Sequence, residues 1–149
     1  MSELRIRFIG PVDERLRPEV CAFARWIREW YTFTNPLEIR LCGDMTVSDW
    51  DGEPCSLVWR QSDRGREKVT AELAVGTFAQ NLEVDGDDVA YPTVLYAIGR
   101  IIKYYFQSIH GAQMREDYAD RWSEKLFAAY CDDTTPPPPR SGIRLQWRE

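Results

Sequence analysis

The strongest constraint on the fold lies in residues 92–130, which predict two consecutive helices joined by a tight corner. In the first part of this stretch, large apolar side chains recur at three- and four-residue spacing: Leu95, Ile98, Ile102, Tyr105 and Ile109. Side chains with this spacing form one continuous stripe, which a globular protein buries against a sheet. His110 and Gly111 mark the end of the first helix, and a second, amphipathic helix is predicted as far as Tyr130.

The second predicted helix begins with a distinctive string of residues. Residues 116–122 read Glu-Asp-Tyr-Ala-Asp-Arg-Trp. This string is similar to the Glu-x-x-Ala-Asp pattern, followed by an aromatic residue, of the zincin metallopeptidases, and more narrowly of the smallest gluzincin-like domains. In those families the preceding helix carries His-Glu-x-x-His.

The resemblance extends to the positions of the first helix, but the residues at these positions differ from those of the family. Tyr96 and Arg100 stand where the family has its two metal-binding His residues, and Ala97 stands where it has the general-base Glu. A zinc site needs two imidazoles one helical turn apart and a carboxylate that polarises the bound water. Arg100 stays positively charged and would repel a divalent cation. The resemblance therefore implies a zincin-like domain that is no enzyme and that holds neither a metal nor another cofactor.

Polar side chains beside the apolar stripe suggest what replaced the metal. Tyr96, Arg100, Lys103 and Gln107 line up on a neighbouring face of the first helix. Glu116 takes the remaining former ligand position, so Arg100 can form a charge-assisted pair with it while Tyr96 packs on the guanidinium. Asp120 and Trp122 are expected next to these positions.

Two other interpretations of the helix pair stay open. Glu116, Asp117 and Asp120 could form the carboxylate site of a metal-dependent hydrolase, although the neighbouring Arg115 and Arg121 favour a solvated ion-pair surface. Alternatively, the string arose by chance in an ordinary helix pair. Apart from the helix pair, the protein could be a structural or assembly subunit that uses its C-terminal tail as a strand donor.

Composition restricts the class of protein. The 149 residues are 44% hydrophobic and 13% aromatic, which is enough for one packed domain. The 19 basic and 24 acidic residues give a net charge of −5, which argues against a general nucleic-acid binder. Without a signal-like start, a membrane-length apolar run or a Cys-x-x-Cys pair among its four cysteines, the chain is expected to be cytoplasmic, with reduced thiols.

The residues ahead of the helix pair predict a small sheet and a covering helix. Apolar and charged side chains alternate in residues 4–9 and 37–41, and a polar turn separates residues 56–61 from 68–78, as in a hairpin. Helical spacing of apolar side chains predicts a helix at residues 18–33.

The strand ahead of the long helix is the candidate peptide-binding strand. Val69, Ala71, Leu73 and Val75 face one way in this strand. In active zincins the strand before the metal helix is the edge along which an extended peptide lies. The resemblance therefore implies that this strand can pair with a partner peptide.

Residues 134–149 are predicted as a proline-rich linker and tail beyond a domain of residues 1–133. Pro136 begins a run of four prolines, which favours an extended polyproline conformation without backbone donors. We expect this run to leave the domain as a stiff spacer, although such a segment can also dock in an aromatic-lined groove. Residues 140–149 alternate like a strand that needs a partner.

Together these patterns predict an α+β domain with zincin-like architecture, in which a small mixed β-sheet is packed by an N-terminal helix and two C-terminal helices. The expected function is that of a catalytically inactive, metallopeptidase-like module that binds or regulates an unknown protein or peptide. Neither a nucleic acid nor a membrane is an expected partner, and a homo-oligomer is left open.

Overall fold

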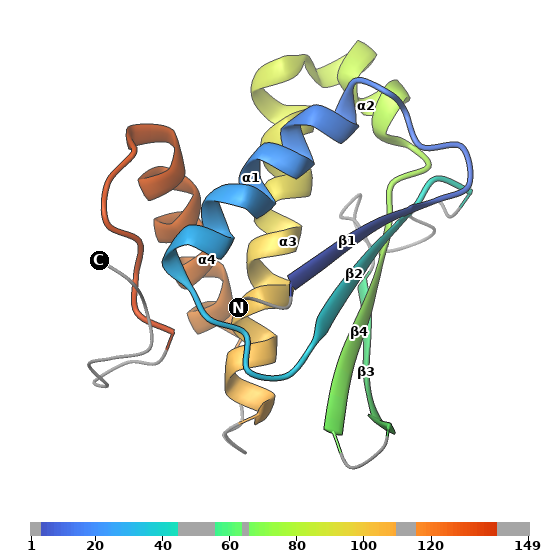
Figure 1. Cartoon of the computed structure of the whole chain (residues 1–149). Coiled ribbons are helices and arrows are strands. Elements are labelled where there is room, and N and C mark those ends of the chain that lie inside the picture. Colours follow the sequence, from blue (N-terminus) through green and yellow to red (C-terminus); the bar gives the residue numbers. More distant parts are fainter. Residues whose placement is uncertain (1–3, 45–55, 64–65, 110–115, 140–149) are drawn as a thin grey trace.

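The computed structural model describes the backbone of residues 4–44, 56–63, 66–109 and 116–139, and the side chains of residues 4–44, 68–106 and 121–139. Strands and helices alternate in the first half of the chain, and helices fill the second half (Figure 1). In chain order the elements are β1 (Leu4–Ile9), α1 (Leu16–Trp30), β2 (Leu37–Cys42), β3 (Ser56–Asp63), β4 (Arg66–Ala74), α2 (Phe78–Asp85), α3 (Asp87–Ile109) and α4 (Glu116–Asp132).

The strands form one small mixed sheet in the order β1-β2-β4-β3. β1, β2 and β4 run parallel, and β3 runs antiparallel to β4. The register pairs Leu4 with Leu37 and Leu37 with Val69, so their side chains share one face of the sheet. The predicted α+β class and mixed sheet are therefore confirmed.

The prediction that β4 offers a free edge to a peptide is wrong. β4 lies between β2 and β3, and its backbone is paired on both sides. Three of the predicted contact residues are buried against the helices, namely Val69, Ala71 and Leu73, and Val75 donates its N–H to the Cys42 carbonyl at 3.1 Å. The outer strands of the described sheet are β1 and β3, because the chain inserts the last strand into the middle.

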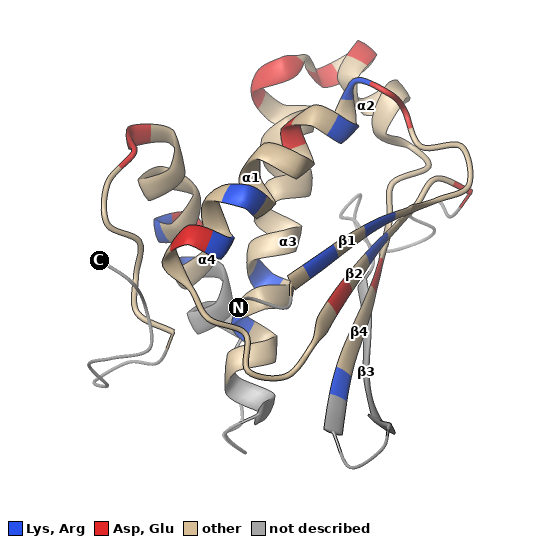
Figure 2. Ribbon diagram, in the orientation of Figure 1, with Lys and Arg blue, Asp and Glu red and all other residues tan. Residues whose placement is uncertain are grey.

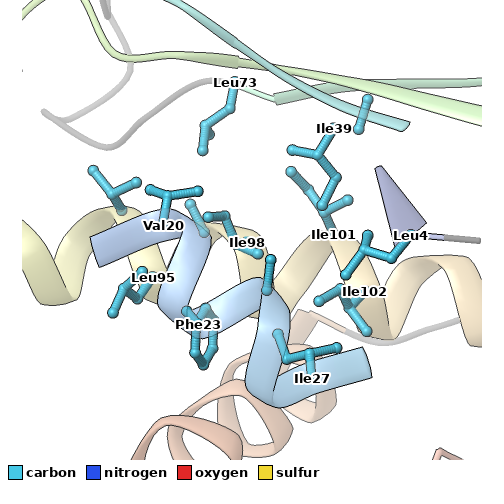
Figure 3. Packing of buried hydrophobic residues seen from close by; sticks show 14 of the residues in the cluster. Leu4, Val20, Phe23, Ile27, Ile39, Leu73, Leu95, Ile98, Ile101 and Ile102 are labelled. Carbon is cyan, nitrogen blue, oxygen red and sulfur yellow. The ribbon is translucent and has the colours of Figure 1, made fainter. Parts of the chain in front are cut away.

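Helices α1 and α3 cover the apolar face of the sheet, and α4 packs against α3 farther from the strands (Figure 1). Figure 3 shows how side chains from two helices and three strands meet between the layers. The labelled residues are Val20, Phe23 and Ile27 of α1, Leu95, Ile98, Ile101 and Ile102 of α3, and Leu4, Ile39 and Leu73 of the sheet. The apolar stripe predicted for the long helix is the centre of this core.

The sequence prediction misses one helix. The strand predicted as far as Phe78 ends at Ala74, and Phe78 begins α2 instead. The Phe78 ring packs edge-on against Tyr91 of α3 at a centroid distance of 5.2 Å. Burial of this ring against α3 stabilises a short helix whose own apolar periodicity is weak.

The long helix also begins earlier than predicted. α3 starts at Asp87 because Gly86, at φ 84°, turns the chain between α2 and α3. Pro92 therefore lies inside the helix rather than in its first turn. The helical carbonyl that Pro92 leaves without a donor belongs to Asp88, an exposed residue of the first turn, where water can replace the lost hydrogen bond.

α3 and α4 make a close approach at Gly99. A Cβ atom at this position would lie 2.4 Å from Ser123 Oγ and 3.4 Å from Leu126 Cδ2. The Ser123 hydroxyl is fixed there because it donates a 2.8 Å hydrogen bond to the Tyr96 carbonyl. A side chain at position 99 therefore requires the two helices to move apart or the Ser123 bond to break.

We predict that Gly99→Ala destabilises the fold. Overpacking costs about 1–3 kcal/mol, and the better helix propensity of Ala offsets about 1 kcal/mol of that cost. Urea unfolding of the wild type, G99A, S123A and the double variant measures both effects. Because the clash is with Ser123 Oγ, G99A should cost clearly less in the S123A background, and an equal cost in both backgrounds would contradict the assignment.

A buried carboxylate lies on the sheet face opposite the core. Glu38 is 2% exposed and accepts a 2.5 Å hydrogen bond from Arg40 Nε and a 3.4 Å bond from Lys68 Nζ. Arg7 lies 3.8 Å from the same carboxylate, and Figure 2 shows these opposite charges on neighbouring strands. Burial by itself raises the pKa of Glu38, but the Arg40 hydrogen bond and the Lys68 charge outweigh burial and lower the pKa below its ordinary value.

The lowered pKa predicts an acid-sensitive contribution to stability. A carboxyl whose folded pKa is depressed stabilises the fold fully above its unfolded pKa, about 4.3, and loses that contribution as the pH falls through the folded value. Glu38→Gln should therefore cost about 2 kcal/mol near pH 7. Unfolding free energies measured from pH 7 to pH 3 should show this difference shrinking, whereas a constant difference would contradict the prediction.

Candidate functional site

The chain reverses direction immediately after α4. Asp133 adopts a left-handed backbone conformation at φ 53°, and the Thr134 N–H donates to the Ala129 carbonyl at 2.9 Å. Residues 134–139 then run back beside α4 (Figure 1). The prediction that the proline run leaves the domain as a spacer is therefore wrong for residues 134–139, while residues 140–149 lie outside the described chain.

The proline run lies on an aromatic surface built from three elements. Tyr31 follows the last turn of α1, Phe106 comes from α3 and Trp122 from α4. The Tyr31 ring centroid lies 5.6 Å from that of Phe106 and 5.9 Å from that of Trp122, and Phe106 and Trp122 are 6.3 Å apart. These three mutually packed rings, together with Lys103 of α3, are called the proline groove below.

Three side chains of the proline groove donate hydrogen bonds to three consecutive prolyl carbonyls. The Tyr31 hydroxyl donates to the Pro137 carbonyl at 2.6 Å, and Trp122 Nε1 donates to that of Pro138 at 2.7 Å. Lys103 Nζ donates to the Pro139 carbonyl at 2.7 Å. Proline has no backbone N–H, so a proline run offers acceptors only, and the groove meets it with donors only.

Burial along the proline run has a three-residue period. Pro136 and Pro139 are buried, whereas Pro137 and Pro138 are half-buried. A polyproline helix has three residues per turn, so residues three apart lie on the same side of it. The pattern agrees with an extended polyproline segment that turns Pro136 and Pro139 towards the domain.

Lys103 lies in an unusual position for a lysine. It is 3% exposed, and its ammonium group lies 5.4 Å from the centroid of the Trp122 ring. A desolvated ammonium next to an aromatic face gains cation–π attraction, and the Pro139 carbonyl satisfies one of its donors. Lys103 and Trp122 thus form one unit that holds two neighbouring carbonyls.

Tyr31 is held as a hydrogen-bond donor. Its side chain is 1% exposed, and burial raises the pKa of the phenol well above its ordinary value. The hydroxyl therefore stays protonated throughout the physiological pH range and donates to the Pro137 carbonyl. A phenolate would only be an acceptor and would repel that carbonyl.

Two further aromatic residues, Phe33 and Tyr105, pack against Phe106 of the proline groove. Phe33 packs on Phe106 at 5.5 Å and on Tyr105 at 5.3 Å. The Tyr105 hydroxyl donates to the Asn35 carbonyl at 2.6 Å and accepts from the Asn35 N–H at 3.1 Å. These contacts fix the loop between α1 and β2 and hold the Phe106 ring in place. None of them involves the proline run.

The structure describes the side chains of three of the four predicted former metal positions. The Tyr96 ring packs on Phe127 at 4.9 Å, and Ala97 is buried in the core at 2% exposure. Arg100 is half-buried. Trp122, expected beside this site, lies in the proline groove.

The carboxylates of the two metal-based interpretations are not described. Glu116, Asp117 and Asp120 belong to the first turns of α4, but their side chains lie outside the described residues. The Arg100–Glu116 pair and the carboxylate cluster therefore stay predictions. Among the side chains that the structure describes, no group of three or more His, Cys, Asp or Glu residues is arranged to hold a metal ion.

Sequence reasoning did not assign Tyr31, Phe106 or Lys103 to a common site. The spacing of apolar side chains places Tyr31 on the core stripe of the helix predicted at residues 18–33, and Lys103 belongs to the predicted polar face of the long helix. The available signals were a lysine inside an otherwise apolar helix and a proline run that needs donors. Neither signal indicates that the two lie together, because the contact joins segments 36 residues apart.

None of the helices in the described parts of the chain is long and apolar enough to cross a membrane. No family model, curated protein or solved structure shows significant similarity to this chain. The geometry of the proline groove is therefore the observation on which a function can be built.

We predict that Tyr31→Phe weakens the docking of the proline run while keeping the aromatic floor. The change removes only the hydroxyl that donates to Pro137, and a single hydrogen bond of this kind contributes about 0.5–1.5 kcal/mol. Chemical unfolding should show that the free energy of unfolding falls by about this amount. Tyr104→Phe is the matched control. Tyr104 lies on α3 and is 48% exposed, so loss of its hydroxyl should change the free energy of unfolding little.

Proposed function

We propose that this chain is a non-catalytic peptide-binding module whose ligand is an extended, proline-rich segment of another protein. The observation that carries the proposal is the set of three donors, Tyr31, Trp122 and Lys103, aligned with three consecutive prolyl carbonyls. Aromatic grooves that present donors to the carbonyls of a polyproline helix are a recurrent mode of peptide recognition.

The chemistry of the groove suits a ligand of this class. Proline segments are already extended before they bind, so little conformational entropy is lost on binding. Tyr31, Phe106 and Trp122 are rigid rings held by packing, so little side-chain entropy is lost on the protein side either. The donors contact backbone carbonyls rather than side chains, so any segment with the same proline spacing can make the same contacts.

The proposal keeps the class of function predicted from the sequence and moves the site. The resemblance to zincins suggested a peptide along a strand edge or in a cleft next to Tyr96, Ala97 and Arg100. The proline groove instead lies about one helical turn farther along α3, at Lys103, and includes Tyr31 at the end of α1. A degenerate zincin-like origin of the domain remains part of the proposal, supported by the Glu-x-x-Ala-Asp string alone.

Titration with a synthetic peptide tests the proposal. A labelled peptide with the sequence of residues 133–140 is added to the full chain and followed by fluorescence anisotropy. A matched peptide with alanine at the four proline positions is the control, because it loses both the preformed conformation and the proline rings. We expect saturable binding of the proline peptide only.

Substitutions in the groove locate the binding site. Lys103→Met and Trp122→Phe, each made in a chain that also carries Pro136→Ala and Pro139→Ala so that its own proline run does not compete, remove one donor and keep an apolar side chain, and each should weaken binding about tenfold, corresponding to about 1.4 kcal/mol. Arg121→Gln, at the exposed residue next to Trp122, is the control and should have little effect. Equal affinity in all variants, or no saturable binding at millimolar peptide, would contradict the proposal.

A further inference from the structure

The segment that occupies the proline groove belongs to the same chain, so any partner peptide must compete with it. Residues 136–139 are tethered to the end of α4 through the turn at Asp133. A short tether gives the bound segment an effective concentration on the order of millimolar. A free peptide of equal intrinsic affinity would therefore compete poorly against it.

Pro136 and Pro139 are the residues by which the tethered segment is anchored. Both are buried, while Pro137 and Pro138 between them are half-buried. The hydrogen bonds go to carbonyl groups, which every residue type provides, so the groove distinguishes residues only through the buried rings. The spacing of the two buried rings is Pro-x-x-Pro.

The rings of the proline groove pack on one another and on the domain behind them. Tyr31 and Phe106 are packed on each other at 5.6 Å, and Phe106 is stacked on Phe33 at 5.5 Å, so none of these contacts depends on the prolines. Local release of the segment thus removes none of these ring contacts.

We propose that residues 136–139 act as an intramolecular competitor for the proline groove, anchored by Pro136 and Pro139, and that a partner with a Pro-x-x-Pro segment must displace them. This inference rests on the proposed peptide-binding function and adds its regulation and its spacing rule. The apparent association constant for a partner is the intrinsic association constant multiplied by the fraction of molecules in which the segment is released.

Paired proline substitutions in the full chain test the proposal. Pro136→Ala with Pro139→Ala removes both anchors, and Pro137→Ala with Pro138→Ala removes the same number of prolines between them. The probe is the labelled peptide of residues 133–140, measured by anisotropy against both variants and the wild type. Near-ultraviolet circular dichroism checks that each variant is folded, and Pro139→Ala alone replaces the first variant if the double substitution does not fold.

The expected result is a gain of binding in one variant only. If about 1% of wild-type molecules have the segment released, removal of the anchors should raise the affinity for the free peptide by about tenfold or more. The variant at Pro137 and Pro138 should change by less than about threefold.

The other outcomes are distinct from one another. Equal binding by the wild type and both variants would overturn the intramolecular competitor and leave the peptide-binding function standing. Equal gains in both variants would overturn the Pro-x-x-Pro anchoring. Absence of peptide binding in all three proteins would contradict the proposed function itself, and the competitor with it.

Discussion

The close contact between α3 and α4 at Gly99 sets the geometry on which the rest of the site depends. Gly99 lies one helical turn before Lys103 on α3, and its partner Ser123 is the neighbour of Trp122 on α4. The spacing of the two helices at Gly99 therefore fixes the distance between the Lys103 ammonium and the Trp122 ring. The same pair of residues then holds the carbonyls of Pro139 and Pro138.

The pairing of groups in the proline groove follows from the chemistry of proline. A buried proline run brings carbonyl acceptors without N–H donors, so its acceptors need donors from side chains. Lysine is rarely buried unless its charge is compensated, and Lys103 meets this condition through a carbonyl and an aromatic face. The fold thus places the desolvated Lys103 ammonium where it donates to the Pro139 carbonyl, which has no donor within the proline run.

The sequence allowed much of the fold to be predicted because local periodicity and burial agree there. The strand at residues 4–9 and the strand beginning at Leu37 were predicted close to their observed bounds. The position of β4 in the middle of the sheet could not be predicted, since strand order depends on long-range pairing rather than on the alternation of Val69, Ala71 and Leu73. α2 was missed because its stability comes from the contact between Phe78 and Tyr91.

The site was predicted less well than the fold, for a related reason. Each residue of the proline groove has an ordinary role within its own segment, Tyr31 as the end of an amphipathic helix and Lys103 as a polar helical position. Their common role arises only when the αL turn at Asp133 sends the proline run back along α4. Residue patterns describe neighbours along the chain, whereas this site joins positions from 31 to 139.

The central claim is that residues 136–139 occupy a binding site and are not an inseparable part of the core. Native-state hydrogen exchange of the Trp122 indole N–H, compared with the amide of Ile102 in the middle of α3, measures this directly. Local release of the proline run exposes the indole without unfolding α3, so the account predicts a clearly lower opening free energy for Trp122 than for Ile102. Equal opening free energies for the two groups would show that the segment leaves only when the whole domain unfolds, and would contradict the account.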